Sequence, residues 1–477
     1  MIETPGVYLT VFSLYFAFMI GVGWTASRKT NSPLAFFLAN RNLRSWVTAI
    51  SSTASSESAW AVLGTVGLAY KEGLSAIWFL PGCLLGYAVN WLLLAERLRK
   101  YSRETHALTL PDYLEGHFQD SSRTLRIVSV VIVFSCMMAY IAAQFTAVGK
   151  TFDAIFDIPH YVSVPIGAVI IVAYTMLGGF LAVVWTDFFQ GLIMVIGLVI
   201  LAISTIIYLG GFSEILDKIQ SISPQTLEWR GGKSIPAFVG SVVGLLGIGL
   251  GYPGQPHVLN RYMAAKDSQT ISRGTWIAFG WGLLIYSSAI LLGVVGNVLI
   301  PGLEDPEQLF PRAAEMILPP TLSAIVLTGV LAAIMSTVSA QIIVAASSVA
   351  HDIYSKILYM ELSHDQILRV SRGSILILGI GGTLVALMKT QVIFWFVLFA
   401  WSGLGASFGP LILFTLYWRR TTHQGALAGM LTGFIVTVFW KLAGWSDSII
   451  YELVPAFLFS TLAICFVSLK TVKKSRV

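Results

Sequence analysis

The residues best suited to chemistry lie at positions 51–58, where the sequence reads Ser-Ser-Thr-Ala-Ser-Ser-Glu-Ser. Six hydroxyls and one carboxylate here interrupt a stretch, Ser45 to Tyr70, that is otherwise apolar enough to cross a bilayer. Hydrocarbon contains no water to solvate such groups, so they persist at membrane depth only when buried in protein or lining a wet cavity. The cluster therefore predicts a binding site inside the membrane, centred on Glu57.

A second group of oxygen atoms is expected on one face of a later helix. Ala333, Ser336 and Thr337 are spaced i, i+3 and i+4, so a backbone carbonyl and two hydroxyls share that face. Hard cations such as sodium take shells of oxygen ligands, which Ala54 and Glu57 opposite this face would complete. Alone, Ser and Thr in membrane helices more often hydrogen-bond their own helix or a neighbour. Together with the carboxylate, the pattern favours an ion site.

Asp187 is the second acidic residue placed at or within an expected span. It could cap the N-terminus of a helix, where the helix dipole favours an anion. It could equally bind a second cation or lie on the path by which an ion leaves. Both interpretations stay open.

Composition shows that membrane helices must position these residues. Of 477 residues, 56% are hydrophobic and 11% charged, with a mean hydropathy of +0.77, whereas a soluble domain carries roughly twice that charged fraction. Crossing ~30 Å of hydrocarbon takes about 20 apolar residues, which predicts an all-α membrane protein with about thirteen spans. The expected spans are 6–26, 45–70, 75–96, 125–150, 162–178, 182–209, 236–254, 274–300, 320–348, 369–388, 392–417, 423–443 and 449–470.

The distribution of charge predicts an N-terminus outside and a C-terminus inside, because most of the 30 Lys and Arg residues then face the cytoplasm. The net charge of +6 reports this topology and gives no reason to expect nucleic acid. Arg28 and Lys29 follow the first span, the reverse of a secretory signal, so we expect it to remain as a helix. The loops are too short for a catalytic domain, and Cys83, Cys136 and Cys465 lack metal-ligand spacing. An enzyme is not expected.

The seventh span resembles the second in being unsuited to a regular helix. Glycines recur from Val243 to Gly254, and Pro253 and Pro256 follow; glycine costs about 1 kcal/mol and proline about 3 inside a helix. Each interrupted span opens a group of five, 45–209 and 236–417. Matching interruptions in two halves are typical of inverted-repeat secondary transporters. The alternative is close helix packing through glycine, which we expect of the pair Gly82 and Gly86.

Several stretches resemble the sodium:solute symporter family, and most closely its sodium/proline branch. The similarity extends over nearly the whole chain and rests on residues 107–113, 178–183 with 185–187, 249–252 with 254–257, Arg261 with 263–265, 331–339 and 399–401. It implies a LeuT-like fold of two inverted five-helix repeats and alternating access driven by an inward sodium gradient. The chain then divides into an extra N-terminal helix and loop (1–44), a first repeat (45–209), an extracellular loop (210–235), a second repeat (236–417), and two further helices with a basic tail (418–477).

The resemblance also carries over sites by position. The principal sodium site would use carbonyls of Ala54, Glu57 and Ala333 and hydroxyls of Ser336 and Thr337. A possible second ion site would use Asp187, Ser336 and Ser339. Relatives that have this second site carry a further hydroxyl at the position of Ala340, which argues against a second ion here. The substrate cavity would be lined by Ser58, Trp60, Tyr140, Tyr252, Pro256 and Trp401.

Two departures from the family pattern concern the site itself. Proline carriers have an aspartate at the position of Ser56 and an uncharged residue at that of Glu57, and a tryptophan where this chain has Ile248. Glu57 could balance the cation, pair with the ammonium of the substrate, titrate and couple protons, or act only as a structural acid between helices. Loss of an indole at Ile248 leaves a substrate other than proline open.

These observations predict a sodium-coupled symporter of the bacterial plasma membrane for a small zwitterionic solute, with proline first. Another amino acid, a monocarboxylate, pantothenate or a sugar is the alternative. A solute sensor would need an output domain, and only Thr471 to Val477 follows the last span. Expected partners are sodium as coupling ion, the solute and membrane lipid, with no organic cofactor, nucleic acid or obligate protein partner.

Overall fold

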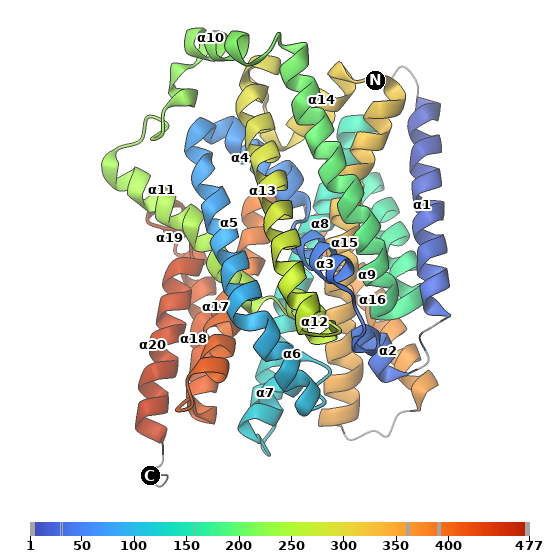
Figure 1. Cartoon of the computed structure of the whole chain (residues 1–477), viewed down its shortest axis with the longest axis vertical. Helices are drawn as coiled ribbons and strands as arrows, with labels where there is room; N and C mark the ends of the chain where they lie inside the picture. The colour runs from blue at the N-terminus through green and yellow to red at the C-terminus, as the bar shows by residue number, and fades with distance from the viewer. Residues whose placement is uncertain are drawn as a thin grey trace.

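The computed structural model describes residues 5–28, 30, 32–156, 158–358, 363–388 and 393–472. These residues form a bundle of helices that run mostly along one axis (Figure 1), and no strand occurs among them. Backbone pairing of Leu43 with Ala264 and Lys266 joins two loops beside α12 (Pro256–Ala264). α1 begins near one end of the bundle and α20 ends near the other (Figure 1).

Ten α-helices of the described chain precede the 3-10 turn η5 of the first long loop. They are α1 (Pro5–Ser27), α2 (Pro33–Leu38), α3 (Ser45–Ser56), α4 (Thr65–Glu72), α5 (Phe79–Ala88), α6 (Ala95–Glu104), α7 (Leu110–Phe118), α8 (Thr124–Phe156), α9 (His160–Tyr208) and α10 (Phe212–Ile222).

Ten further α-helices follow the first long loop in the part of the chain that the structure describes. They are α11 (Ile235–Gly247), α12 (Pro256–Ala264), α13 (Ser268–Leu299), α14 (Leu309–Ile317), α15 (Pro320–Ser347), α16 (His364–Leu387), α17 (Ile393–Tyr417), α18 (His423–Leu442), α19 (Trp445–Ser448) and α20 (Leu453–Thr471). Short 3-10 and π-helical turns join or extend them: η1 (Ala39–Arg41), η2 (Trp60–Gly64), η3 (Gly73–Trp78), η4 (Val89–Leu94), η5 (Pro224–Leu227), η6 (Ile248–Gly254), η7 (Pro306–Gln308) and η8 (Ser348–Ile357).

Among the described residues, 11 helices are long and apolar enough to cross a membrane, and His160–Met176 is a shorter apolar helix. The count differs from the expected thirteen for two physical reasons. The second expected span is divided, so that α3 ends after 12 residues, too short to cross alone. The fifth expected span is the short helix His160–Met176, which continues into the sixth within α9.

Glycine makes the bend inside α9 possible. Gly179 has φ 61° and ψ −160°, a conformation that residues with a Cβ rarely adopt. The ring of Phe36 in α2 also lies where a Cβ would stand. The two expected spans 162–178 and 182–209 therefore meet at this residue as two helices at an angle.

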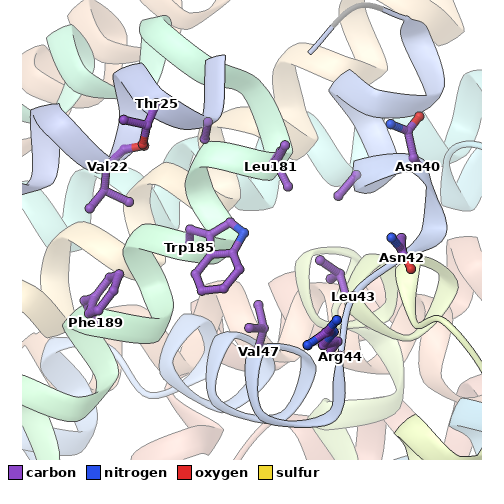
Figure 2. Close-up of a pocket in the computed structure, with 12 residues that line it drawn as sticks. Val22, Thr25, Asn40, Asn42, Leu43, Arg44, Val47, Leu181, Trp185 and Phe189 are labelled. Carbon is purple, nitrogen blue, oxygen red and sulfur yellow. The ribbon is translucent and has the colours of Figure 1, made fainter. Parts of the chain in front are cut away.

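Burial places α15 and α17 at the centre of the bundle. In each, 83% of the most apolar 18-residue window is buried, against 28% in α1 and 33% in α18 and α20. The exposed side chains of the outer helices are apolar, as for Leu14 of α1 and Leu442 of α18, which suits a surface facing lipid. A groove of about 620 Å³ lies between α1, the start of α3 and α9 (Figure 2).

Candidate functional site

The first interruption of a helix lies at Glu57, as predicted. α3 ends at Ser56, and Glu57 has φ −98° and ψ 73°, outside the helical region. The chain turns helical again at η2, and two side chains bond the freed backbone groups. The indole of Trp60 donates to the carbonyl of Ser56 (2.8 Å), and the amide of Ala59 donates to Gln144 Oε1 (3.2 Å).

The second interruption lies in the seventh expected span, also as predicted. α11 ends at Gly247, η6 follows, and Gln255 is extended (φ −90°, ψ 104°) before α12 begins. The indole of Trp401 donates to the carbonyl of Ile248 (3.1 Å), and Gln255 Nε2 donates to the carbonyl of Trp401 (3.1 Å). In both interruptions an indole satisfies a carbonyl that the helix leaves free, which hydrocarbon could not do.

Close packing through glycine accompanies the second interruption, so both interpretations of these glycines hold. A Cβ on Gly82 or Gly86 of α5 would overlap the backbone of the 245–249 segment. A Cβ on Gly249 would overlap the carbonyl oxygen of Gly82, and one on Gly251 would overlap the indole of Trp401. Glycine at these positions therefore allows η6 to pack directly against both α5 and α17.

The oxygen atoms expected to bind sodium come together at the first interruption. Ser336 Oγ donates to the carbonyl of Ala54 (3.0 Å) and to that of Ala333 (3.1 Å), and Thr337 Oγ1 donates to the carbonyl of Ala333 (3.2 Å). All four residues are buried, and Glu57 stands one helical turn beyond Ala54. Both hydroxyls therefore bond their own helix, as the alternative predicts, and that of Ser336 also reaches across to α3. A neutral set of oxygen donors of this kind suits a monovalent hard cation.

Asp187 lies in the interior of a helix and not at its N-terminus. It lies inside α9, about two turns after Gly179, and so does not cap a helix. Its Oδ2 accepts hydrogen bonds from Ser51 Oγ (2.7 Å) and from Arg261 Nη2 (2.8 Å), and both ion-pair partners are fully buried. Ser339 Oγ donates to the carbonyl of Ser336 (3.1 Å). The structure joins Asp187 to α3 through the hydrogen bond from Ser51 and to α12 through an ion pair that the sequence did not predict.

Aromatic side chains fill the space between the two interruptions. The ring of Trp401 lies 6.0 Å from that of Trp60 and 4.8 Å from that of Tyr252, centre to centre. Tyr140 lies 6.3 Å from His257. These residues are buried, as are Ser58 and Pro256.

Glu57 faces a group of aromatic donors. Its carboxylate accepts hydrogen bonds from the hydroxyl of Tyr87 and from Trp281 Nε1 (2.6 Å). The ring of Tyr87 lies 5.0 Å from that of Tyr252, whose hydroxyl bonds that of Tyr286 (2.8 Å). The carboxylate therefore borders the aromatic region and is not isolated between helices.

Two buried polar residues of this region were not predicted from the sequence. Gln144 and His257 are fully buried, and among the described residues no hydrogen-bond partner reaches Gln144 Nε2, either ring nitrogen of His257 or the hydroxyl of Tyr140. Unpartnered buried polar atoms are uncommon and mark places where water, an ion or a ligand bonds. The only available signal was the position of His257 after the glycine and proline run.

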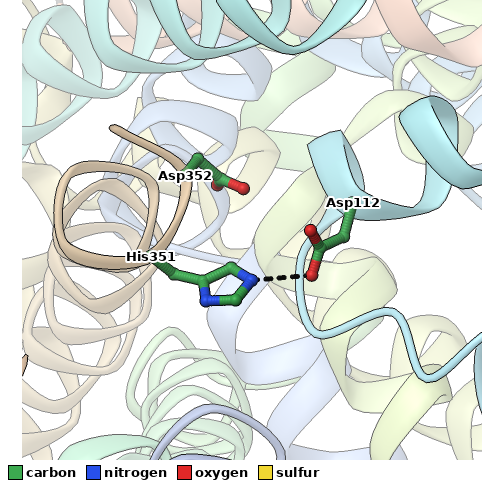
Figure 3. A group of neighbouring side chains, drawn as sticks. All are labelled: Asp112, His351 and Asp352. Atoms are coloured by element: carbon green, nitrogen blue, oxygen red, sulfur yellow. Dashed lines mark hydrogen bonds and ion pairs between the residues drawn. The ribbon is translucent and has the colours of Figure 1, made fainter. Parts of the chain in front are cut away.

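A polar cluster lies where α7 meets η8 (Figure 3). Asp112 of α7 accepts from His351 Nε2 (2.8 Å) and pairs with Arg126 of α8 (2.6 Å), which also pairs with Asp352 of η8. Burial raises the pKa of Asp112, but the hydrogen bond and charge of His351, with those of Arg126, outweigh it and hold that pKa well below its usual range. The carboxylates and imidazole lie close enough to suit a metal. A guanidinium that already pairs with both aspartates makes the cluster an ion-pair network.

An all-helical membrane protein whose two interrupted helices face each other at a buried polar site is built as an inverted-repeat secondary transporter. The chain belongs to the sodium:solute symporter family, whose model matches residues 36–433. It is 35% identical to the sodium/proline symporter of Salmonella typhimurium over 98% of this chain and 93% of that one. It is also 35% identical to the high-affinity proline transporter PutP of Bacillus subtilis over 95% of this chain and 96% of that one.

Solved structures support the same fold. The chain superimposes on the substrate-bound outward-open state of a Na⁺-coupled sialic acid symporter with a TM-score of 0.82, covering 97% of this chain and 98% of that one at 18% identity. Mhp1, a nucleobase-cation-symport-1 family transporter in a closed conformation, gives a TM-score of 0.54 at 13% identity, covering 92% and 96%. The expected LeuT-like fold is confirmed. The protein is an integral plasma-membrane transporter of the kind found in bacteria and not an enzyme, and sodium is its coupling ion.

Proposed function

We propose that the protein imports L-proline together with sodium by alternating access. The observation that carries this proposal is the pair of interrupted helices, which present carbonyls and hydroxyls on one side and aromatic rings on the other. The 35% identity to proline transporters over nearly the full length supports proline as the solute.

Sodium binds, in this proposal, between α3 and α15. The carbonyls of Ala54, Glu57 and Ala333 and the hydroxyls of Ser336 and Thr337 are its ligands. Support comes from the 3.0 Å bond between Ser336 Oγ and the carbonyl of Ala54, which shows that oxygen atoms of α15 and α3 lie in direct contact. Each hydroxyl would turn a lone pair toward the ion.

A second ion at Asp187, Ser336 and Ser339 is disfavoured. The guanidinium of Arg261 lies 2.8 Å from Asp187 Oδ2 and already supplies the positive charge that a cation would bring. A second cation beside this arginine would meet like-charge repulsion in a buried setting. We infer that one sodium ion accompanies each solute molecule and that the ion pair fixes α9 to α12.

The solute binds between the two interruptions, against Ser58, Trp60, Tyr140, Tyr252, Pro256 and Trp401. Amides of an unwound helix suit a carboxylate, and the aromatic faces suit a pyrrolidine ring. The unpartnered hydroxyl of Tyr140 and the imidazole of His257 add polar groups that a zwitterion could satisfy.

Glu57 recognises the amine of the solute in this proposal. Its carboxylate borders the aromatic group around Tyr252, and an ammonium between a carboxylate and aromatic faces gains from both. The placement of the acid here, one residue beyond the position of Ser56, keeps a negative charge within the same interruption.

Uptake of labelled proline into proteoliposomes tests the function. Sodium, potassium and pH gradients are imposed separately, and only the inward sodium gradient is expected to drive accumulation. Accumulation driven equally well by a proton gradient would favour the alternative in which Glu57 titrates.

A different solute of the same family is the second candidate, and Ile248 favours it. Its side chain is smaller than an indole, and it lies in the 3-10 segment that the solute would contact. Counterflow distinguishes the two, because unlabelled proline should compete with itself better than another amino acid, a monocarboxylate, pantothenate or a sugar does. Failure of proline to compete would exclude it as the substrate.

A further inference from the structure

The groove on the outer wall of the bundle is built from segments far apart in the sequence (Figure 2). Its volume of about 620 Å³ falls in the range of ~300–1,000 Å³ that ligand sites occupy. Its walls are mostly apolar, and they are formed by Val22 and Ala26 of α1, Ala39, Leu43 and Val47, and Leu181, Trp185 and Phe189 of α9.

One end of the groove is polar and basic. Asn40, Asn42 and Arg44 line it and are exposed, and Figure 2 shows Asn42 and Arg44 together where the chain enters α3. None of the 12 lining residues is acidic. Arg44 joins none of the ion pairs formed among the described residues, so its positive charge is available to a ligand.

Tryptophans around the groove locate it at a membrane surface. Trp24, Trp46 and Trp185 expose 51%, 61% and 40% of their area, and the guanidinium of Arg28 stacks 3.7 Å from the ring centre of Trp24. Exposed indoles with basic neighbours are typical of the boundary between hydrocarbon and headgroups. The polar end therefore lies at headgroup depth, and the apolar wall extends from it toward hydrocarbon.

We propose that this groove binds an anionic phospholipid from the leaflet on the Arg44 side. The phosphate lies at the guanidinium of Arg44 and the amides of Asn40 and Asn42, and an acyl chain lies along Trp185 and Phe189. Charge complementarity selects an anionic lipid, since basic pockets between membrane helices hold acidic headgroups. The inference does not rest on the identity of the transported solute.

The bound lipid would brace two helices that carry the polar site. Arg44 directly precedes α3, whose Ala54 carbonyl meets Ser336. Trp185 lies two residues from Asp187, which bonds Ser51 of α3. A lipid filling the space between α3 and α9 therefore restricts their relative movement, and occupancy should affect transport as well as stability.

Binding of phosphatidylglycerol and of phosphatidylcholine with identical chains, measured by native mass spectrometry on the full-length protein in detergent, tests the proposal. We expect the wild type to retain phosphatidylglycerol preferentially. Arg44→Gln should lower that affinity about fivefold, the loss that follows from removing one basic residue beside an anionic lipid. The matched control is Arg420→Gln, an exposed arginine outside the groove, which should leave it unchanged.

Leu181→Trp, which fills the groove without altering its charge, should lower binding of both lipids there. Equal retention of the two lipids by the wild type, or unchanged preference in Arg44→Gln, would overturn the proposal. If the protein retained inorganic phosphate as strongly as phosphatidylglycerol, the ligand of the groove would be a soluble anion instead. A change of oligomeric mass in Arg44→Gln without any lipid preference would identify a second copy of the chain as the occupant.

Discussion

Ser336 is the residue on which the proposed ion site depends most. Its hydroxyl bonds both helices that border the site, through the carbonyl of Ala54 in α3 and that of Ala333 in α15. Thr337 hydrogen-bonds, among the described residues, only to its own helix. The spacing of these residues predicted a shared face correctly, because a helix fixes which side chains neighbour one another.

Ser336→Ala is expected to weaken sodium activation of uptake by about 10- to 100-fold, because a bond to a charged partner contributes about 1.5–3 kcal/mol. The half-saturating sodium concentration in proteoliposomes measures this. Ser347→Ala is a suitable control, since Ser347 lies on the same helix and its hydroxyl donates within that helix, to the carbonyl of Ile343 (2.7 Å). Equal sodium dependence in both variants would refute the ligand assignment.

Glu57→Gln is expected to raise the half-saturating proline concentration at least tenfold while leaving sodium activation nearly unchanged. The amide keeps the shape of the side chain but loses the charge that attracts an ammonium. N-acetylproline, which has no charged amine, supplies the control. It should compete poorly with labelled proline in the wild type, and the variant should no longer discriminate against it. If sodium activation weakened instead, Glu57 would balance the cation, and unaltered sodium, proline and pH dependence would leave only a structural role.

At the scale of elements, the interruptions exist because glycine and polar residues remove helical continuity while long-range partners satisfy the freed backbone. Composition predicted both interruptions. The partners could not be predicted, since Gln144 lies 85 residues from Ala59 and Trp401 lies 153 residues from Ile248. For the same reason, a large separation along the sequence, the pairing of Asp187 with Arg261 and that of Glu57 with Trp281 could not be predicted.

Gly249→Ala is expected to abolish uptake and to lower the melting temperature of the purified protein. An added methyl group would overlap the carbonyl of Gly82 in α5, and backbone on both sides leaves no flexible group to move. Gly280→Ala in α13 is the matched control, because nothing lies within 4 Å of its added Cβ. A fully active Gly249→Ala protein would show that η6 does not pack this closely.

At the scale of the whole molecule, the apolar segments predicted an all-α membrane protein because each span must be apolar over its full length. The LeuT-like fold was predicted by the two interrupted spans and by the family resemblance. The departures arose where one span was divided at Ser56 and where two joined at Gly179. The polar cluster of Figure 3 was not predicted. The three residues drawn there come from α7 and η8, Arg126 of α8 pairs with two of them, and no spacing connects the four in the sequence.

Asp112→Asn is expected to destabilise the protein by about 1.5–3 kcal/mol near neutral pH, the contribution of hydrogen bonds to a charged group. Because the pKa of Asp112 is lowered in the folded state, its stabilising effect is present above the unfolded pKa of about 4 and is lost as the pH falls below it. The melting temperatures of variant and wild type should therefore converge at acidic pH. Glu104→Gln, which changes an exposed acid, is the control and should melt like the wild type at every pH. A difference in melting temperature between Asp112→Asn and wild type that stayed constant with pH would contradict the ionic explanation.

The most direct test of the account is the affinity of the purified protein for labelled proline at increasing sodium concentration. If the two interrupted helices hold ion and solute together, sodium must raise the affinity for proline, and proline must raise the affinity for sodium by the same factor. Replacing sodium with potassium should abolish the increase. Proline binding of equal strength in sodium and in potassium would contradict the account.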